Sequence, residues 1–128
     1  MDKITLDLIN IYSNKIRKTL NSMIEEINGD FTGWCELTSM MMYRIIKENF
    51  PNIKENRIVE GTFKNDGHYW NIIDGVTVDL AIDQFGGYKI GIINKRWLNN
   101  YKVVKVKNYS DFDLEHMTDE FIDFIQIT

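Results

Sequence analysis

The sequence predicts an α+β fold: an N-terminal helix and a buried cysteine-bearing helix pack on an antiparallel sheet of four or five strands, and a C-terminal helix closes the domain. Three observations lead to this class. Apolar residues recur every three or four positions over residues 2–28 and 35–49, short β-like segments separated by turn residues fill 57–107, and helical spacing returns after Ser110. Residues 1–128 are enough for one domain and too few for two.

The first predicted helix spans residues 2–28 and is amphipathic. Asn28-Gly29 supplies the left-handed stop expected at a helix C-terminus. Its apolar stripe consists of Ile9, Tyr12, Ile16, Leu20, Met23, Ile24 and Ile27.

The second predicted helix, residues 35–49, begins at the only cysteine and is the most apolar of the chain. Gly33 permits a sharp turn of the chain into this helix. Phe50-Pro51 ends the helix because proline disfavours helical geometry in the preceding residue. We expect the helix to be mostly buried, with its methionines as core filler. Its apolar residues are Leu37, Met40, Met41, Met42, Tyr43, Ile45 and Ile46.

The β-like segments are 57–63, 68–73, 76–82, 88–94 and 101–107, with a possible bulge at Gly61. Asp74-Gly75 between the second and third is among the strongest short-range hairpin signals. Ser110 is the expected N-cap of the last helix. That helix has apolar residues at Phe112, Leu114, Met117, Phe121, Phe124 and Ile125.

Composition narrows the possible functions and location. A net charge of −4 with scattered basic residues argues against nucleic-acid binding. We expect no membrane association and a cytoplasmic location, because no apolar run resembles a signal peptide or a membrane span. One cysteine excludes an internal disulfide, and the richness in Ile, Asn and Lys suggests a bacterial or phage source.

The predicted hairpin gathers residues with catalytic chemistry on one face. A two-residue loop at Asp74-Gly75 puts His68 diagonal to both Asp79 and Asp83 across the hairpin. The backbones of such diagonal residues are roughly 7–8 Å apart, which is within side-chain reach. A His–carboxylate pair is what a nucleophilic cysteine needs, since the imidazole moves the proton and the carboxylate orients the imidazole. Cys35 is the candidate nucleophile, because the unpaired N–H groups of a helix N-terminus favour a thiolate.

These residues resemble the transglutaminase-like and papain-like superfamily of cysteine enzymes. The resemblance rests on Gly33-Trp34-Cys35, Gly67-His68-Tyr69-Trp70, and the stretch from Asp74-Gly75 to Asp79 with Gln84-Phe85 behind it. It implies a Cys35, His68, Asp79 triad that acts on amide or peptide bonds of a protein or peptide substrate, by hydrolysis, deamidation or acyl transfer through a thioester, without a cofactor. It also favours Asp79 over Asp83. Supporting roles at the substrate or oxyanion are expected for Trp34, Trp70 and Gln84.

Other interpretations remain open on the sequence. A lone cysteine is usually a small buried apolar residue, and the chain could be a non-catalytic binding or inhibitory protein. A zinc site is disfavoured because Cys35, His68 and His116 have no recognised ligand spacing, and His116 is expected to be exposed on the last helix. The backbone N–H of Cys35 is the expected first donor to the oxyanion. Neither a second donor nor the oligomeric state can be predicted.

Overall fold

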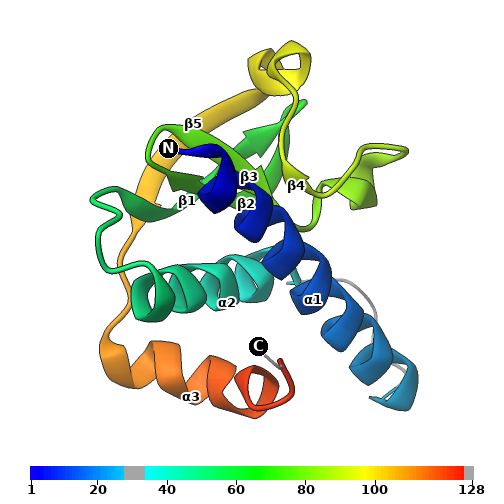
Figure 1. Cartoon of the computed structure of the whole chain (residues 1–128). Helices are drawn as coiled ribbons and strands as arrows, with labels where there is room; N and C mark the ends of the chain where they lie inside the picture. Colours follow the sequence, from blue (N-terminus) through cyan, green and yellow to red (C-terminus); the bar gives the residue numbers. More distant parts are fainter. Residues whose placement is uncertain (28–33, 126–128) are drawn as a thin grey trace.

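A computed structural model of the chain describes residues 1–27 and 34–125, and the side chains of all of these except 24–27. Three layers are visible in Figure 1: the sheet, the helix α2 beneath it, and the helix α3 below α2, with α1 crossing both the sheet and α2. The sheet is antiparallel with strand order β4-β3-β2-β1-β5. The predicted α+β class is therefore confirmed. The elements are α1 (Lys3–Ile27), α2 (Trp34–Asn49), β1 (Asn56–Phe63), β2 (Asp66–Ile73), β3 (Val76–Asp79), the 3₁₀ helix η1 (Ile82–Phe85), β4 (Gly91–Ile92), the 3₁₀ helix η2 (Lys95–Asn100), β5 (Tyr101–Lys107) and α3 (Asp111–Ile122).

The main core lies between the helices and one face of the sheet. From the apolar stripes predicted for the first two helices, Ile9, Tyr12, Ile16, Leu20, Ile45 and Ile46 are buried there. The three consecutive methionines of α2 are all at most 2% exposed. Burial of such side chains stabilises the fold by roughly 1.5–3 kcal/mol each. The core includes Ile9, Ile16, Leu20, Met41, Met42, Ile45, Ile46, Ile73, Val78 and Leu80.

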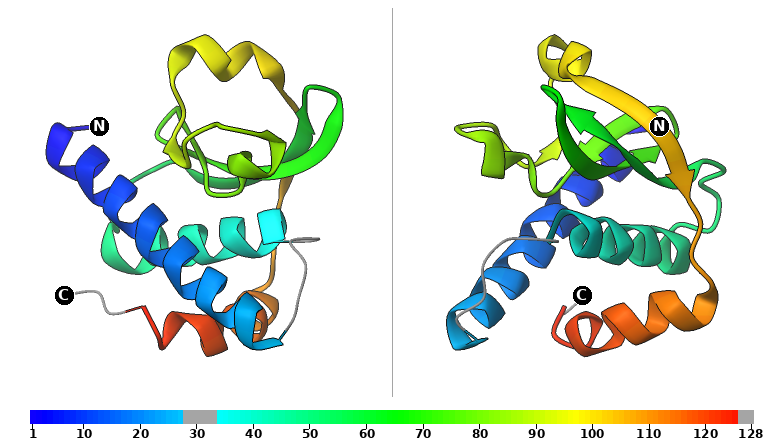
Figure 2. Two further views of the ribbon diagram at one scale, coloured as in Figure 1. Left: turned by 90° about the vertical axis from the view of Figure 1, so that its right-hand side faces the viewer. Right: turned by 180° about the vertical axis from the view of Figure 1, so that it is seen from behind.

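A second, smaller core covers the opposite face of the sheet. It is built by the segment between β3 and β5, which folds back over the sheet as η1, β4 and η2 (Figure 2). Its buried residues are Phe63, Ile82 and Ile93, and aromatic rings of Phe85, Tyr88, Trp97 and Tyr101 pack against them. Both faces of the central strands are thus shielded from water.

Two predicted strands are shorter than expected. The third strand stops at Asp79 because the chain turns into η1, and the predicted strand 88–94 is reduced to Gly91–Ile92. Gly91 has φ +103°, and the neighbouring Ile92 N–H donates to Asn10 Oδ1 of α1 at 3.1 Å. Helix α1 therefore covers the edge where further strand pairing was predicted.

The predicted hairpin and bulge are both present. Asp74 and Gly75 have φ of +46° and +77°, which is the geometry of a two-residue hairpin loop. The register between β1 and β5 shifts at Glu60/Gly61. The predicted helix stop at Asn28-Gly29 and the entry at Gly33 lie outside the described residues.

Helix α3 contacts the rest of the protein through fewer of its apolar side chains than its sequence predicts. Ser110 caps it as expected, since its Oγ accepts from Asp113 N–H at 3.0 Å. Phe112, Met117 and Phe124, however, are 73%, 50% and 64% exposed. The helix is fastened to α2 by ion pairs as well as by Leu114, with Arg44 bonded to Thr118 and Asp119, and Lys47 bonded to Asp111. Within the described residues, no helix is both long enough and apolar enough to cross a membrane.

Candidate active site

His68 and Asp79 form the predicted pair across the hairpin. Strands β2 and β3 pair in the predicted register, with Ile73 opposite Val76 and Asn71 opposite Val78. His68 Nε2 lies 2.7 Å from Asp79 Oδ2, and both side chains are completely buried. Asp83, the alternative partner, instead accepts from Arg17 Nη1 at 2.6 Å.

Asp79 is held from two further directions. Its Oδ1 accepts from the backbone N–H of Ala81 at 2.9 Å, and its Oδ2 also accepts from the Tyr101 hydroxyl at 2.8 Å. Burial, followed by the charge and hydrogen bond of Asp79, raises the pKa of Tyr101 far above its ordinary value of 10, so the phenol remains a donor. The carboxylate is thereby fixed toward His68.

Cys35 is the second residue of α2 and is partly exposed. Its thiol lies near enough to His68 to contribute to the pKa of that imidazole. Burial lowers the pKa of His68, but the hydrogen bonds and negative charges of Asp79 and Cys35 outweigh burial and raise it to about 9. Nε2 is bonded to Asp79 and Nδ1 lies 2.9 Å from Gln84 Nε2, so a thiol that bonds Nδ1 must displace Gln84 or share Nδ1 with it. The structure thus pairs His68 with Asp79 and places Cys35 near His68.

The helix start that carries Cys35 is fastened to the strand that carries His68. Within the first turn, Thr38 Oγ1 and Ser39 Oγ donate to the Cys35 carbonyl at 3.1 and 2.6 Å. Asn71 Nδ2 on β2 then donates to the Ser39 carbonyl at 2.9 Å. Asn71 lies three residues after His68 and on the opposite face, so one strand positions both the imidazole and the nucleophile's helix.

Two of the three predicted supporting residues, Trp70 and Gln84, contact the imidazole. Trp70 is buried and lies nearly parallel to the His68 ring, with centroids 5.9 Å apart and an interplanar angle of 27°. Gln84 Nε2 lies 2.9 Å from His68 Nδ1, which suits a neutral imidazole with its proton on Nε2. With a pKa of about 9 the imidazolium predominates at neutral pH, and the carboxamide must then turn over so that Oε1 accepts. Gln84 can therefore bond both protonation states of His68.

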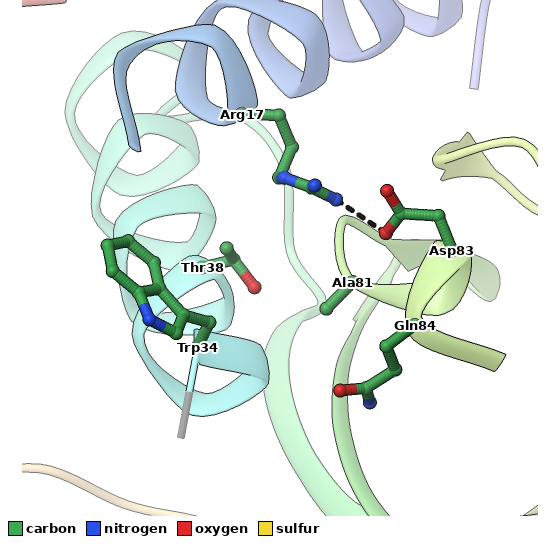
Figure 3. Close-up of a pocket in the computed structure, with 6 residues that line it drawn as sticks. All are labelled: Arg17, Trp34, Thr38, Ala81, Asp83 and Gln84. Atoms are coloured by element: carbon green, nitrogen blue, oxygen red, sulfur yellow. Dashed lines mark hydrogen bonds and ion pairs between the residues drawn. The ribbon is translucent and has the colours of Figure 1, made fainter. Parts of the chain in front are cut away.

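A cavity of about 310 Å³ opens beside the triad, between the start of α2 and η1 (Figure 3). Trp34 and Thr38 line it from α2, and Arg17 reaches across from α1 to Asp83. Arg17 Nη1 also donates to the Leu80 carbonyl at 2.6 Å, which anchors the guanidinium. The remaining walls are Ala81 and Gln84. Trp34 thus lines the space beside Cys35, and its ring packs edge-on against Phe121 with centroids 6.5 Å apart.

Glu36, the residue after Cys35, is bonded to the other side of the molecule. Its Oε2 accepts a hydrogen bond from the Tyr109 hydroxyl. Burial and then this interaction raise the pKa of Tyr109 well above its ordinary value. The hydrogen bond fixes the Glu36 carboxylate through Oε2 and leaves its negative charge in place.

Two residues of the site were missed by sequence reasoning. Tyr101 reaches Asp79 only because β5 pairs with β1, a long-range register that local spacing does not reveal. Asn71 could have been found from the sequence, because it stands among Ile and Val residues on the apolar face of the hairpin. An amide at such a position indicates a specific hydrogen bond.

Comparisons with known protein families, with curated proteins and with solved structures find no match to this chain. Among the residues that the structure describes, no group of three His, Cys, Asp or Glu side chains is placed to hold a metal ion. A function must therefore be inferred from the geometry and chemistry of the site.

Proposed function

We propose that this chain is a cysteine-nucleophile enzyme of transglutaminase-like or papain-like type that acts on amide or peptide bonds through a thioester. The observation that supports the proposal is the buried His68–Asp79 pair, whose carboxylate is held by two further donors, with Cys35 close enough to raise the pKa of His68. This order of nucleophile, base and orienting acid is the arrangement used for nucleophilic acyl chemistry. The substrate is a protein or peptide.

In the acylation step, the thiol proton of Cys35 is held on His68 Nδ1 as a thiolate–imidazolium pair, and the thiolate attacks the acyl carbon. The tetrahedral intermediate collapses when the imidazolium returns that proton to the leaving nitrogen, which departs as an amine or ammonia. Asp79 holds the ring through Nε2 and stabilises its positive charge. The backbone N–H of Cys35 at the helix start is the proposed donor to the oxyanion.

In the deacylation step, the thioester is attacked by water or by an amine. His68 Nδ1 removes a proton from the incoming nucleophile, and the thiol leaves with that proton. Water yields a carboxylic acid, and hence proteolysis or deamidation, whereas an amine yields a transferred acyl group. The acyl group would lie toward the cavity lined by Trp34, which precedes Cys35 in the chain, and by Gln84, which contacts His68.

Acylation by an activated ester tests this proposal without knowledge of the substrate. We expect p-nitrophenyl acetate to release a stoichiometric burst of p-nitrophenolate and to leave an acetyl group on Cys35, as seen by intact mass and peptide mapping. The burst should be lost in Cys35→Ser and slowed about a hundredfold or more in His68→Gln, since general acid–base catalysis is commonly worth that much.

His116→Gln is the matched control, because it removes the other histidine from an exposed position on α3. Adding a primary amine should speed loss of the acetyl group if acyl transfer is the activity, and leave it unchanged if hydrolysis is. Acetylation of Cys35 at the same rate in the parent and in His68→Gln would refute an assisted nucleophile.

A further inference from the structure

Positive and negative charges are separated along the last third of this chain. Residues 84–110 contain six Lys or Arg and no Asp or Glu, whereas residues 111–125 contain six Asp or Glu and no Lys or Arg. Figures 1 and 2 show η2, within the first segment, at the far end of the molecule from α3 in every view. The overall charge of −4 therefore conceals a locally basic surface.

A second cavity, separate from the one lined by Trp34 and Gln84, is lined mostly by residues of the basic segment 84–110. It measures about 430 Å³, within the range of small-molecule sites. Its apolar floor is formed by Ile82, Ile92 and Ile93, and its aromatic wall by Tyr88 and Trp97, whose rings meet edge to face with centroids 5.1 Å apart.

The cations at this cavity are not neutralised by the protein. Lys89 and Arg96 line it, and Lys64 Nζ lies 5.2 Å from the centre of the Tyr88 ring. Among the side chains that the structure describes, none of these three forms an ion pair with a carboxylate, whereas Arg44, Lys47 and Arg57 elsewhere all do. Their charge is therefore available to an anion.

Polar groups at the rim complement these charges. Asn94 lines the cavity, and its Oδ1 accepts from Arg96 N–H at 3.1 Å. Arg96 lies over the Trp97 ring at 4.8 Å, so the guanidinium and indole are held together. A ligand here would meet cationic donors beside aromatic and apolar surface.

We propose that this cavity binds a nucleoside phosphate. The phosphate would pair with Lys89 and Arg96, and the planar base would lie against Trp97, Tyr88 and the isoleucine floor. A bare inorganic anion would leave the apolar floor and aromatic wall uncovered. An acidic peptide would use the charges but not the enclosed aromatic wall, so a nucleotide accounts for both features.

Binding can be followed through the three tryptophan indole N–H resonances of ¹⁵N-labelled protein, with Trp97 assigned from Trp97→Phe. We expect AMP to shift the Trp97 resonance saturably, with a dissociation constant on the order of 1 mM or below, and to leave the buried Trp70 unshifted. Adenosine alone and inorganic phosphate alone should each bind at least about tenfold more weakly, because each satisfies only half of the cavity.

Lys89→Glu should weaken AMP binding at least about tenfold by reversing a charge at the cavity. Lys54→Glu makes the same change in net charge at an exposed site outside the cavity and should leave binding unchanged. Arg96→Ala gives a second variant if Lys89→Glu does not fold. A short oligothymidylate that binds more tightly than AMP would identify a nucleic-acid strand as the source of the nucleotide, and the reverse order would identify the free nucleotide.

Three results would overturn this assignment: no shift of Trp97 with AMP or the oligothymidylate, equal affinity for phosphate and AMP, or equal weakening by Lys54→Glu and Lys89→Glu. None of these readouts depends on Cys35.

Discussion

His68 combines complete burial with a raised pKa, and this combination explains what its neighbours do. Burial opposes the charged ring, so the imidazolium persists to about pH 9 only because Asp79 and Cys35 stabilise it. Asp79 in turn depends on Tyr101 and the Ala81 N–H to stay aimed at the ring. Each of these contacts can be tested by substituting one residue.

Tyr101→Phe tests the support of Asp79. Loss of the hydroxyl removes one of the donors to a buried carboxylate, and we expect the free energy of unfolding to fall by about 1–3 kcal/mol. Acylation of Cys35 should slow several-fold because the His68 ring is held less firmly. Urea unfolding and the p-nitrophenolate burst measure the two effects, and Tyr43→Phe, away from Asp79, is the control. A Tyr101→Phe protein identical to the parent in both would contradict this role.

The raised pKa of His68 predicts a pH dependence of stability. A group whose pKa is higher in the folded state contributes fully below its unfolded pKa, here 6.5, and loses that contribution as pH rises through about 9. The loss is on the order of 3 kcal/mol for a shift of this size. Urea unfolding at pH 6 and pH 10 should therefore show a fall in the parent that is much smaller in His68→Gln. Equal falls in the two proteins would assign the dependence to other groups.

At the scale of elements, the site depends on how closely β1, β2 and β5 approach one another. Gly61 lies opposite His68 on β1, at the bulge where β5 shifts register. A Cβ at Gly61 would lie 2.0 Å from the Lys102 carbonyl oxygen and 2.7 Å from the Trp70 ring. The absence of a side chain there lets Trp70 lie flat beside His68 and lets β5 bring Tyr101 to Asp79.

Gly61→Ala should therefore destabilise the protein by roughly 2–3 kcal/mol, because backbone and indole must both move. Gly67→Ala is the matched control in the same hairpin, since a Cβ at Gly67 would meet nothing within 4 Å. Urea midpoints of the two variants provide the comparison. If both glycines tolerate alanine equally, the close approach at Gly61 is not needed for the fold.

At the scale of the whole molecule, local patterns predicted the helices, the hairpin and the His68–Asp79 pair. The pair was predictable because a two-residue loop fixes the register of strands that are adjacent in sequence. Tyr101 was not, because its place depends on pairing β5 with β1 from the far side of the sheet. The strand expected at 88–94 was overestimated for a similar reason, since α1 covers that edge.

The position of Cys35, the proposed nucleophile, was only partly predictable from the sequence. Its helix start was predictable from the sequence, but its meeting with His68 depends on α2 packing on β2 through Asn71 and Ser39. The cavity beside it also joins α1, α2 and η1, which are far apart in the chain. No local sequence pattern contains that arrangement. Candidate site residues could therefore be predicted from the sequence, whereas the shape of the cavity around them could not.

The most direct measurement of the central claim is the rate of Cys35 alkylation by iodoacetamide at pH 6, in the parent, His68→Gln, Asp79→Asn and the control His116→Gln. An ordinary cysteine, with a pKa of roughly 8.5, is almost entirely protonated at that pH and reacts slowly. If His68 and Cys35 form an activated pair, the parent and His116→Gln will react fast and His68→Gln at least about tenfold more slowly, with Asp79→Asn also slowed. A slow thiol that is indifferent to His68 and Asp79 would contradict the account and would favour a binding protein built on this fold.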